Sequence, residues 1–239
     1  DLDLMFIGDD SSGAADLMRS LSELTTEGRL YSVDARLRPE GKAGPLACPV
    51  AAFTDYFERG RGQLWEAQAL TKSRPICGPA QAQWLEAAQS IWRKFGNRAD
   101  TPAEISVMYE RVVRGRSGGD DFRDFKTGSG GLVQVEFFTQ SRQMTAGVWE
   151  PNTIAALERL GQYGVLPIQT ARDLTDAYHR LRRVEAILRR MDDTAVSRLP
   201  NDEADLSRLA CRAGFTTPGE FREYYEHARE TIRTRAALA

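Results

Sequence analysis

Three acidic residues have the spacing of a divalent cation site. Asp1 and Asp3 lie in the segment DLDLMFI, residues 1–7, whose apolar character predicts a buried strand. Side chains alternate between the faces of a strand, so both carboxylates point the same way, with Cα atoms roughly 7 Å apart. A second strand, LYSVDARL at residues 30–37, carries Asp34. If the two strands are close neighbours in one sheet, we expect the three carboxylates on one face.

Arg36 and Arg38 share the parity of Asp34 and would join this cluster. Crowded carboxylates repel one another unless a cation neutralises them. Mg²⁺ prefers hard oxygen ligands, typically one or two carboxylates plus substrate phosphates, and arginines hold phosphate oxygens in bidentate fashion. The set favours phosphoryl chemistry. A lone Asp-x-Asp, by contrast, is usually a solvated edge, and Asp34 with the arginines alone could be a structural ion-pair ladder.

The elements that must position these side chains follow the order strand, helix, strand. Ser11 or Ser12 is placed to cap the helix. After a loop rich in Pro and Gly at residues 38–49, the pattern is nearly all helical. Further helices are predicted at residues 53–57, 64–72, 80–95, from 101, 133–144, 152–161, 170–191, 202–213 and 218–238. We expect an α+β chain with a small α/β domain, residues 1–97, and a helical bundle, residues 98–239, with Trp65, Trp84 and Trp92 in the core.

Composition excludes several classes of function. The net charge of −2, from 32 basic and 34 acidic residues, lacks the basic excess of a protein that wraps nucleic acid. No apolar run approaches the roughly 18 residues of a membrane span, and no cationic leader is present, so we expect a soluble, cytoplasmic protein. Three well-separated cysteines suit reduced thiols. Two histidines in helical patterns argue against a His-based metal site or a Ser-His-Asp hydrolase.

Four longer motifs follow one another along the chain. They are VDARLRPEGKAGPL at residues 33–46, WEAQALTKSRP at 65–75, DFK with GGLVQVEF and a later Gln at 124–140, and NTIAAL at 152–157. Together with the initial DLDL, they resemble the SDLDL, VDxRLRPxGxxGPL, WExxALxKxRP, DxK…GGxxxIEFxxQ and NTxxAL elements of glutamine synthetase adenylyltransferases. The resemblance covers residues 1–157, and the helical remainder is compatible with it.

The resemblance implies a polymerase-β-like nucleotidyltransferase domain followed by a helical bundle. In that family Asp1, Asp3 and Asp34 would be the catalytic, metal-binding carboxylates. The candidates for binding nucleotide phosphate are Arg36, Arg38, Lys72 and Lys126. Lys126 could instead be a loop lysine in solvent, and Lys72 could simply stabilise a helix end. Glu136 could support the metal site, but we favour a structural role in which it pairs with Arg123 or Lys126.

The resemblance also implies an activity and partners. The family moves AMP from ATP onto a tyrosine hydroxyl of glutamine synthetase, and a related half of the same polypeptide removes it by phosphorolysis. Both halves answer to the PII signalling protein and to glutamine. The sequence Trp-Glu-x-Gln-Ala-Leu at residues 65–70 favours the adenylylating, C-terminal half.

Other assignments stay open. The alternatives are the deadenylylating half, a PII uridylyltransferase, which lacks the RLRPxG pattern, and a catalytically silent docking domain, against which the intact acids speak. Because Asp1 already begins a strand-like pattern, we expect the motif to extend upstream. The superfamily's Gly-Ser pair would lie there, and a fragment lacking it should bind nucleotide weakly.

Overall fold

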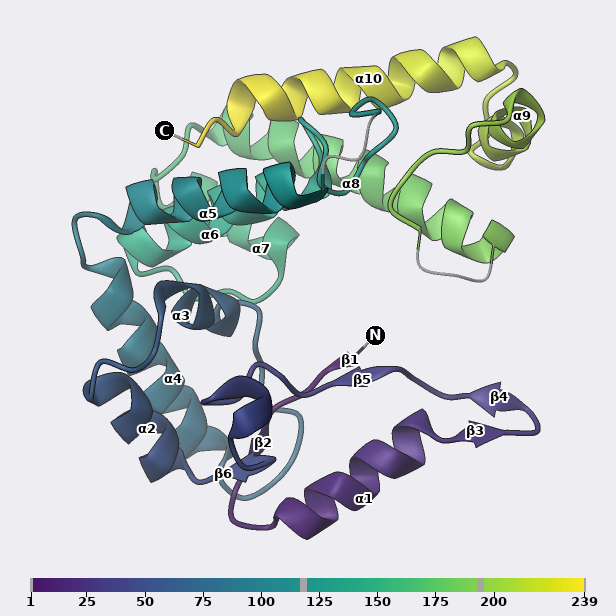
Figure 1. Cartoon of the computed structure of the whole chain (residues 1–239). Coiled ribbons are helices and arrows are strands. Elements are labelled where there is room, and N and C mark those ends of the chain that lie inside the picture. Colours follow the sequence, from purple (N-terminus) through teal and green to yellow (C-terminus); the bar gives the residue numbers. More distant parts are fainter. Residues whose placement is uncertain (1, 117–119, 193–195, 239) are drawn as a thin grey trace. The chain divides into compact units, whose positions relative to one another are not determined.

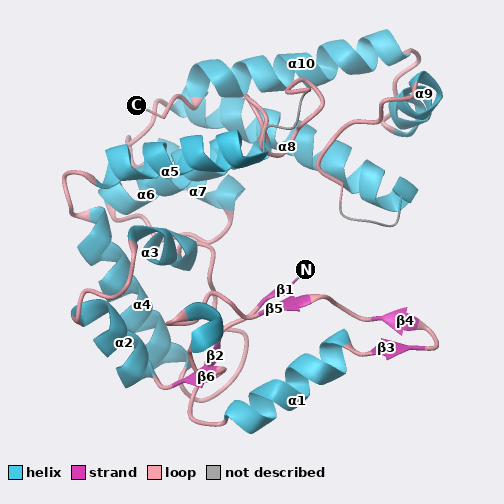
Figure 2. Ribbon diagram, in the orientation of Figure 1, coloured by secondary structure: helices cyan, strands magenta, loops and turns pink. Residues whose placement is uncertain are grey.

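A computed structural model describes residues 2–116, 120–192 and 196–238 and divides the chain into two compact units, residues 1–95 and 96–239. The division falls beside the one predicted after residue 97. Short strands and helices make up the first unit and helices the second, so the chain is α+β (Figure 1; Figure 2). The type of domain that each unit represents stays a prediction.

The described part of the first unit is built from very short strands and four helices. Its elements are β1 Leu2–Asp3, β2 Phe6–Ile7, α1 Ser11–Ser22, β3 Leu24–Thr25, β4 Gly28–Arg29, β5 Val33–Asp34, a 3-10 turn Gly41–Ala43, β6 Ala47–Cys48, α2 Val50–Glu58, α3 Leu64–Leu70 and α4 Gln81–Gly96. β1 pairs with β5 and β2 with β6, both in parallel, while β3 and β4 form an antiparallel hairpin. The predicted strand at residues 1–7 is therefore interrupted between β1 and β2.

The second predicted strand is much shorter than residues 30–37 because the chain turns after Asp34. The Asp34 carboxylate accepts a hydrogen bond from the backbone N–H of Arg36, 2.9 Å away. Such a local side-chain bond replaces a ladder bond. Pro39 follows and has no N–H to donate to a sheet.

Helix α1 begins one residue earlier than the predicted capping positions allow. Asp10 caps it, accepting from the N–H of Gly13 at 2.8 Å. Ser11, which was one of the two predicted caps, lies inside the helix, and its hydroxyl accepts from the N–H of Ala47 at 3.2 Å. The predicted cap was wrong, and Ser11 instead ties α1 to β6.

Aromatic side chains form the core of the first unit. The ring of Phe57 contacts those of Phe53 and Phe95, with centroids 5.3 and 6.0 Å apart. Trp84 and Trp92 are buried as predicted. Trp65 is 49% exposed, so its placement in the core was wrong. It lies on the outer side of α3, whose buried residues include Leu64, Ala67, Gln68 and Leu70.

The described part of the second unit consists mainly of helices, most of which contribute to a shared apolar core. They are α5 Thr101–Arg116, α6 Leu132–Ala146, α7 Thr153–Gln162, α8 Ile168–Asp192, α9 Glu203–Arg212 and α10 Pro218–Arg235. Helix α8 packs against both α7 and α10 (Figure 1). Five residues along it, Leu174, Tyr178, Leu181, Val184 and Leu188, are all buried in that core. Among the described residues, no helix has the length and apolarity of a membrane span.

Candidate functional site

The parallel pair β1–β5 brings two of the predicted carboxylates together. Asp3 lies directly opposite Asp34 in the register. Leu4 donates its N–H to the carbonyl of Asp34 at 2.8 Å, which fixes this register. Residues paired across two strands project to the same face of a sheet, so both carboxylates occupy one face. Asp1, the third predicted acid, lies outside the described residues.

Arg36 supplies the positive charge at this face. Its Nε lies 2.9 and 2.6 Å from the two carboxylate oxygens of Asp34, and its Nη2 also contacts them. These hydrogen bonds hold the pKa of Asp34 below its ordinary value. The pKa of Arg36 is raised, first by its hydrogen bond to Asp34 and also by the charge of Asp3. Asp34 is therefore ionised at neutral pH, with Arg36 as its counter-ion.

Arg38 has a different environment from Arg36. Its Nη1 donates to the carbonyl of Ala35 at 2.5 Å and its Nε to the carbonyl of Gly44 at 3.2 Å. The guanidinium thus braces the loop that follows β5. Its predicted role toward phosphate stays a prediction.

The two predicted lysines lie on different units. Lys72 is an exposed residue of the turn that ends α3, in the first unit. Lys126 belongs to the second unit, where its N–H donates to Asp124 at 3.0 Å. Their roles at the nucleotide stay predictions.

The donor chemistry at β1–β5 fits Mg²⁺. Asp3 and Asp34 offer hard carboxylate oxygens, and two such groups are enough where substrate phosphates complete the coordination shell. Within the described ranges, no group of three or more His, Cys, Asp or Glu side chains is arranged to hold a metal. A site made by these two acids would therefore depend on the nucleotide, or on Asp1, for its remaining ligands.

The glycine-rich segment at residues 120–131 is not an anion-binding loop. Asp124 is buried at its centre and accepts from the N–H and the hydroxyl of Thr127 at 2.7 and 2.8 Å. The first N–H groups of α6 donate to loop carbonyls: Leu132 to Phe125 and Val133 to Lys126, both at 2.9 Å. A phosphate bound at this helix terminus would accept hydrogen bonds from these N–H groups, which already donate to carbonyls of the loop.

Arg229 of α10 is the residue that holds this loop, and the motif analysis did not identify it. Its side chain is 1% exposed. It donates to the carbonyls of Asp121 at 2.7 Å and Ser129 at 2.9 Å, contacts that of Phe122, and pairs with the carboxylate of Asp121 at 3.1 Å. A sequence signal exists: Arg229 continues the buried face of α10 that contains Phe221, Tyr225 and Ile232.

Glu136 has the structural role predicted for it, through another contact. It accepts a hydrogen bond from the hydroxyl of Tyr178 at 2.7 Å. Burial raises the pKa of Tyr178, and the negative charge of Glu136 adds to the effect. Arg123, one of the partners predicted for Glu136, pairs with Asp120 at 2.8 Å.

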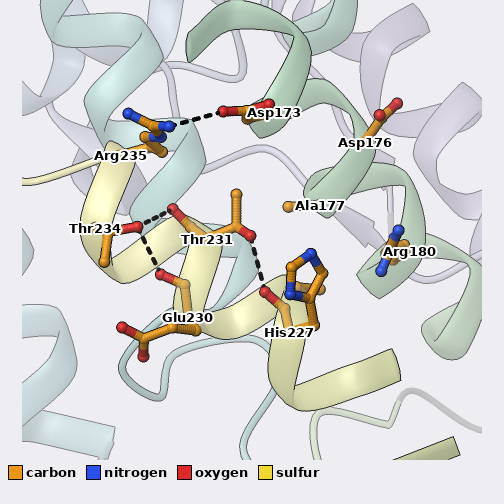
Figure 3. A pocket seen from close by; sticks show the side chains of 10 residues that line it. Asp173, Asp176, Ala177, Arg180, His227, Glu230, Thr231, Thr234 and Arg235 are labelled. Carbon is orange, nitrogen blue, oxygen red and sulfur yellow. Dashed lines mark hydrogen bonds and ion pairs between the residues drawn. The ribbon is translucent and has the colours of Figure 1, made fainter. Parts of the chain in front are cut away.

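A charged surface pocket of about 310 Å³ lies between α8 and α10 (Figure 3). Asp173 faces Arg235 across it at 3.2 Å. The hydroxyls of Thr231 and Thr234 donate to helix carbonyls of α10, at 2.9 Å in each case. These four side chains are therefore already paired, either with each other or with the backbone of α10.

Comparison with known proteins identifies a family for each part of the chain. Residues 11–89 match the family described as glutamate-ammonia ligase adenylyltransferase, and residues 108–238 match the family described as GlnD PII-uridylyltransferase.

Relatives similar along nearly the whole chain are bifunctional glutamine synthetase adenylyltransferase/adenylyl-removing enzymes. That of Brucella melitensis is 32% identical over 233 residues, and that of Rhizobium meliloti 33% over 232; each alignment covers 92% of this chain. The Streptomyces coelicolor enzyme is 35% identical over 228 residues, or 91% of this chain. The chain spans 23% of the length of each of these relatives. The chain therefore belongs to the glutamine synthetase adenylyltransferase family of nucleotidyltransferases, and its helical segment to the domain family named for PII-uridylyltransferases.

Proposed function

We propose that this chain carries a nucleotidyltransferase active site that moves AMP from ATP to a tyrosine hydroxyl of glutamine synthetase. The observation that carries the proposal is the parallel register that sets Asp3 opposite Asp34. Two adjacent carboxylates with an arginine beside them suit a cation and a nucleotide phosphate together. The names of the relatives supply the acceptor protein and the transferred group.

In the proposed reaction the tyrosine oxygen bonds to the α-phosphorus of ATP while the bond to pyrophosphate breaks. Asp3 and Asp34, with Asp1, would hold Mg²⁺, which stabilises negative charge on the attacking and leaving oxygens when bound. Arg36 is 65% exposed at its side chain, so it can leave Asp34 for a phosphate oxygen without disturbing the core. Arg38, Lys72 and Lys126 are proposed as further phosphate contacts. The hydroxyl proton passes to solvent.

The sequence WEAQAL at residues 65–70 supports the adenylylating half. Deadenylylation is the second candidate, because the names of the relatives include adenylyl removal. In that direction inorganic phosphate attacks the phosphorus of the AMP group, and the bond from that phosphorus to the tyrosine oxygen breaks. The products are ADP and the free tyrosine hydroxyl. A cytoplasmic location and control by PII belong to the same proposal.

The test uses the longest natural polypeptide that contains this sequence, incubated with ATP labelled on its α-phosphate, Mg²⁺ and glutamine synthetase. Label on the synthetase supports adenylylation. A parallel reaction starts from adenylylated synthetase and phosphate, and release of ADP assigns deadenylylation. Label transferred to PII from UTP would assign the chain to the uridylyltransferases. No transfer in any reaction would refute the proposal and favour a silent docking domain.

A further inference from the structure

Two arginines of α8 converge on one buried carboxylate in the second unit. The side chains of Arg182 and Arg189 are each 51% exposed, whereas Glu185, which lies between them in the sequence, is 3% exposed. The Nη1 of Arg182 donates to one carboxylate oxygen of Glu185 at 2.5 Å, and the Nη2 of Arg189 donates to the other at 2.8 Å. We call Arg182 and Arg189 the arginine pair.

The arginine pair carries more positive charge than the burial of Glu185 requires. A buried carboxylate must be paired with a positive charge, and one arginine is enough for that. Two guanidinium groups against one carboxylate leave positive charge at the surface of α8. Glu136 of α6 acts further along the same helix, where it accepts from the hydroxyl of Tyr178 at 2.7 Å. The need to neutralise Glu185 therefore accounts for one arginine and not for the second.

Both guanidinium groups can reach a single oxyanion. Because each donates to an oxygen of the same carboxylate, their two donor nitrogens lie no more than roughly 8 Å apart. A guanidinium group has five N–H donors in a planar fork. Among the residues that the structure describes, neither group of the arginine pair donates to an acceptor other than Glu185. The half-exposed side chains thus keep donors for a ligand, and the planar fork matches the oxygens of a phosphoryl group.

We propose that the arginine pair binds a phosphoryl group of a small molecule and that Glu185 positions both arginines for it. The ligand is inorganic phosphate, pyrophosphate or the phosphate chain of a nucleotide. Its oxygens accept from the outward N–H groups, while Glu185 keeps its own hydrogen bonds. Because Glu185 already restricts both side chains, less rotamer entropy is lost when the ligand binds. The inference does not depend on AMP transfer, since it concerns residues of the second unit alone.

The first experiment measures how fast phenylglyoxal modifies each arginine of the longest natural polypeptide, in the absence of divalent cations. Mass spectrometry follows the modification at increasing concentrations of inorganic phosphate, pyrophosphate or ATP. Arg208 and Arg222 are internal controls, because each is exposed and pairs with a single exposed carboxylate in the same unit. We expect a ligand to slow the modification of the arginine pair by roughly fivefold or more and to leave the controls nearly unchanged. The ligand that acts at the lowest concentration identifies the source of the phosphoryl group.

The second experiment measures the affinity of that ligand by isothermal titration calorimetry. Arg182→Gln/Arg189→Gln should weaken binding roughly tenfold or more, because two charge-assisted hydrogen bonds are lost. Arg208→Gln/Arg222→Gln removes the same charge from the same unit and should weaken it less than about twofold. Circular dichroism checks folding. If the first variant is unfolded, Arg182→Lys/Arg189→Lys replaces it, since lysine keeps the charge for Glu185 but lacks the fork, and binding should again weaken.

Three results would overturn the inference. The first is that none of the three ligands protects the arginine pair from phenylglyoxal. The second is equal affinity in the parent and in the folded variant of the arginine pair. The third is an equal loss of affinity in the variant of Arg208 and Arg222, because attraction by the overall charge of the unit would then explain the binding.

Discussion

The two units of this protein use charge in opposite ways. In the first, Asp34 and Arg36 lie at the end of a two-residue strand, and the arginine is mostly exposed to water. In the second, Arg229 is fully buried and its N–H groups are taken up by loop carbonyls and by Asp121. An exposed pair can be opened by a ligand at little cost, whereas a buried guanidinium satisfied by backbone is part of the fold.

The scaffolds differ in the same sense. The strands that position the acids are two residues long, and apolar residues of the first unit stay exposed on the hairpin. Helices α6 to α10 of the second unit share one apolar core. The first unit thus leaves its charged pair open to solvent, whereas the second buries its charged group in a shared core. This contrast can be tested with variants that change the rate of AMP transfer but not the free energy of unfolding, and with variants that do the reverse.

The largest effect on activity is expected from Asp34→Asn in the first unit. Losing one of two paired carboxylates should lower AMP transfer by about 100-fold or more, because the cation loses a charged ligand. The free energy of unfolding should fall by less than about 1 kcal/mol, since the lost ion pair is with an exposed arginine. Transfer rates and urea unfolding measure both quantities. Asp16→Asn is the control, because Asp16 pairs with Arg19 on the exposed face of α1. Retained transfer in Asp34→Asn would refute the site.

Periodicity predicted the helices well, because the buried face of a helix is marked by apolar residues that recur along its whole length. The nine helices predicted after residue 50 all have counterparts, and the boundaries of α4 and α6 differ from the prediction by one or two residues. The short strands were over-extended, because the alternation at residues 30–37 does not reveal that the Asp34 side chain takes the N–H of Arg36. Parity did predict that Asp3 and Asp34 share a face. No sequence motif indicated that Arg229 would pair with a loop more than ninety residues earlier in the chain.

Arg229→Met tests the second unit. It removes a fully buried guanidinium and the donors to the carbonyls of Asp121 and Ser129, so we expect a loss of about 3–5 kcal/mol in the free energy of unfolding. Arg222→Met is the matched control on the same helix, because its partner Glu203 and its own side chain are exposed. That variant should cost less than about 1 kcal/mol. Equal losses in the two variants would contradict the structural role of Arg229.

A smaller effect should separate dense packing from backbone strain. Gly130 of the second unit has φ of 76°, and a Cβ there would lie 2.4 Å from the carbonyl oxygen of Arg229. Gly60 of the first unit has φ of 72°, with nothing within 4 Å of its Cβ position. Both alanine variants meet left-handed strain of about 1–2 kcal/mol, but only Gly130→Ala must also displace backbone, for about 1–3 kcal/mol more. Thermal unfolding of the two variants gives the difference, and equal destabilisation would show that the loop can yield.

The smallest effect is an opposite dependence on pH in the two units. Burial raises the pKa of Glu66, although hydrogen bonds from Gln63 and Tyr56 oppose the rise. Burial alone would also raise the pKa of Asp124, but hydrogen bonds from Thr127, Gly128 and Lys126 outweigh it and lower the pKa. A raised native pKa favours folding at low pH, so the Glu66 contribution is lost as pH rises through its native value. The Asp124 contribution is present above its unfolded pKa and is lost as pH falls through its native value.

Amide hydrogen exchange in the intact chain measures protection in each unit separately. It can therefore follow how protection changes with pH in each unit through the acid range. We expect the protection of α3 to weaken as pH rises, and that of the loop at residues 120–131 to weaken as pH falls, after correction for intrinsic exchange. Glu66→Gln and Asp124→Asn should each flatten the slope of its own unit and leave the other unchanged, because neither side chain can then titrate. If one substitution removed the pH dependence of both units, the two units would not respond to pH independently, and the contrast between them would fail.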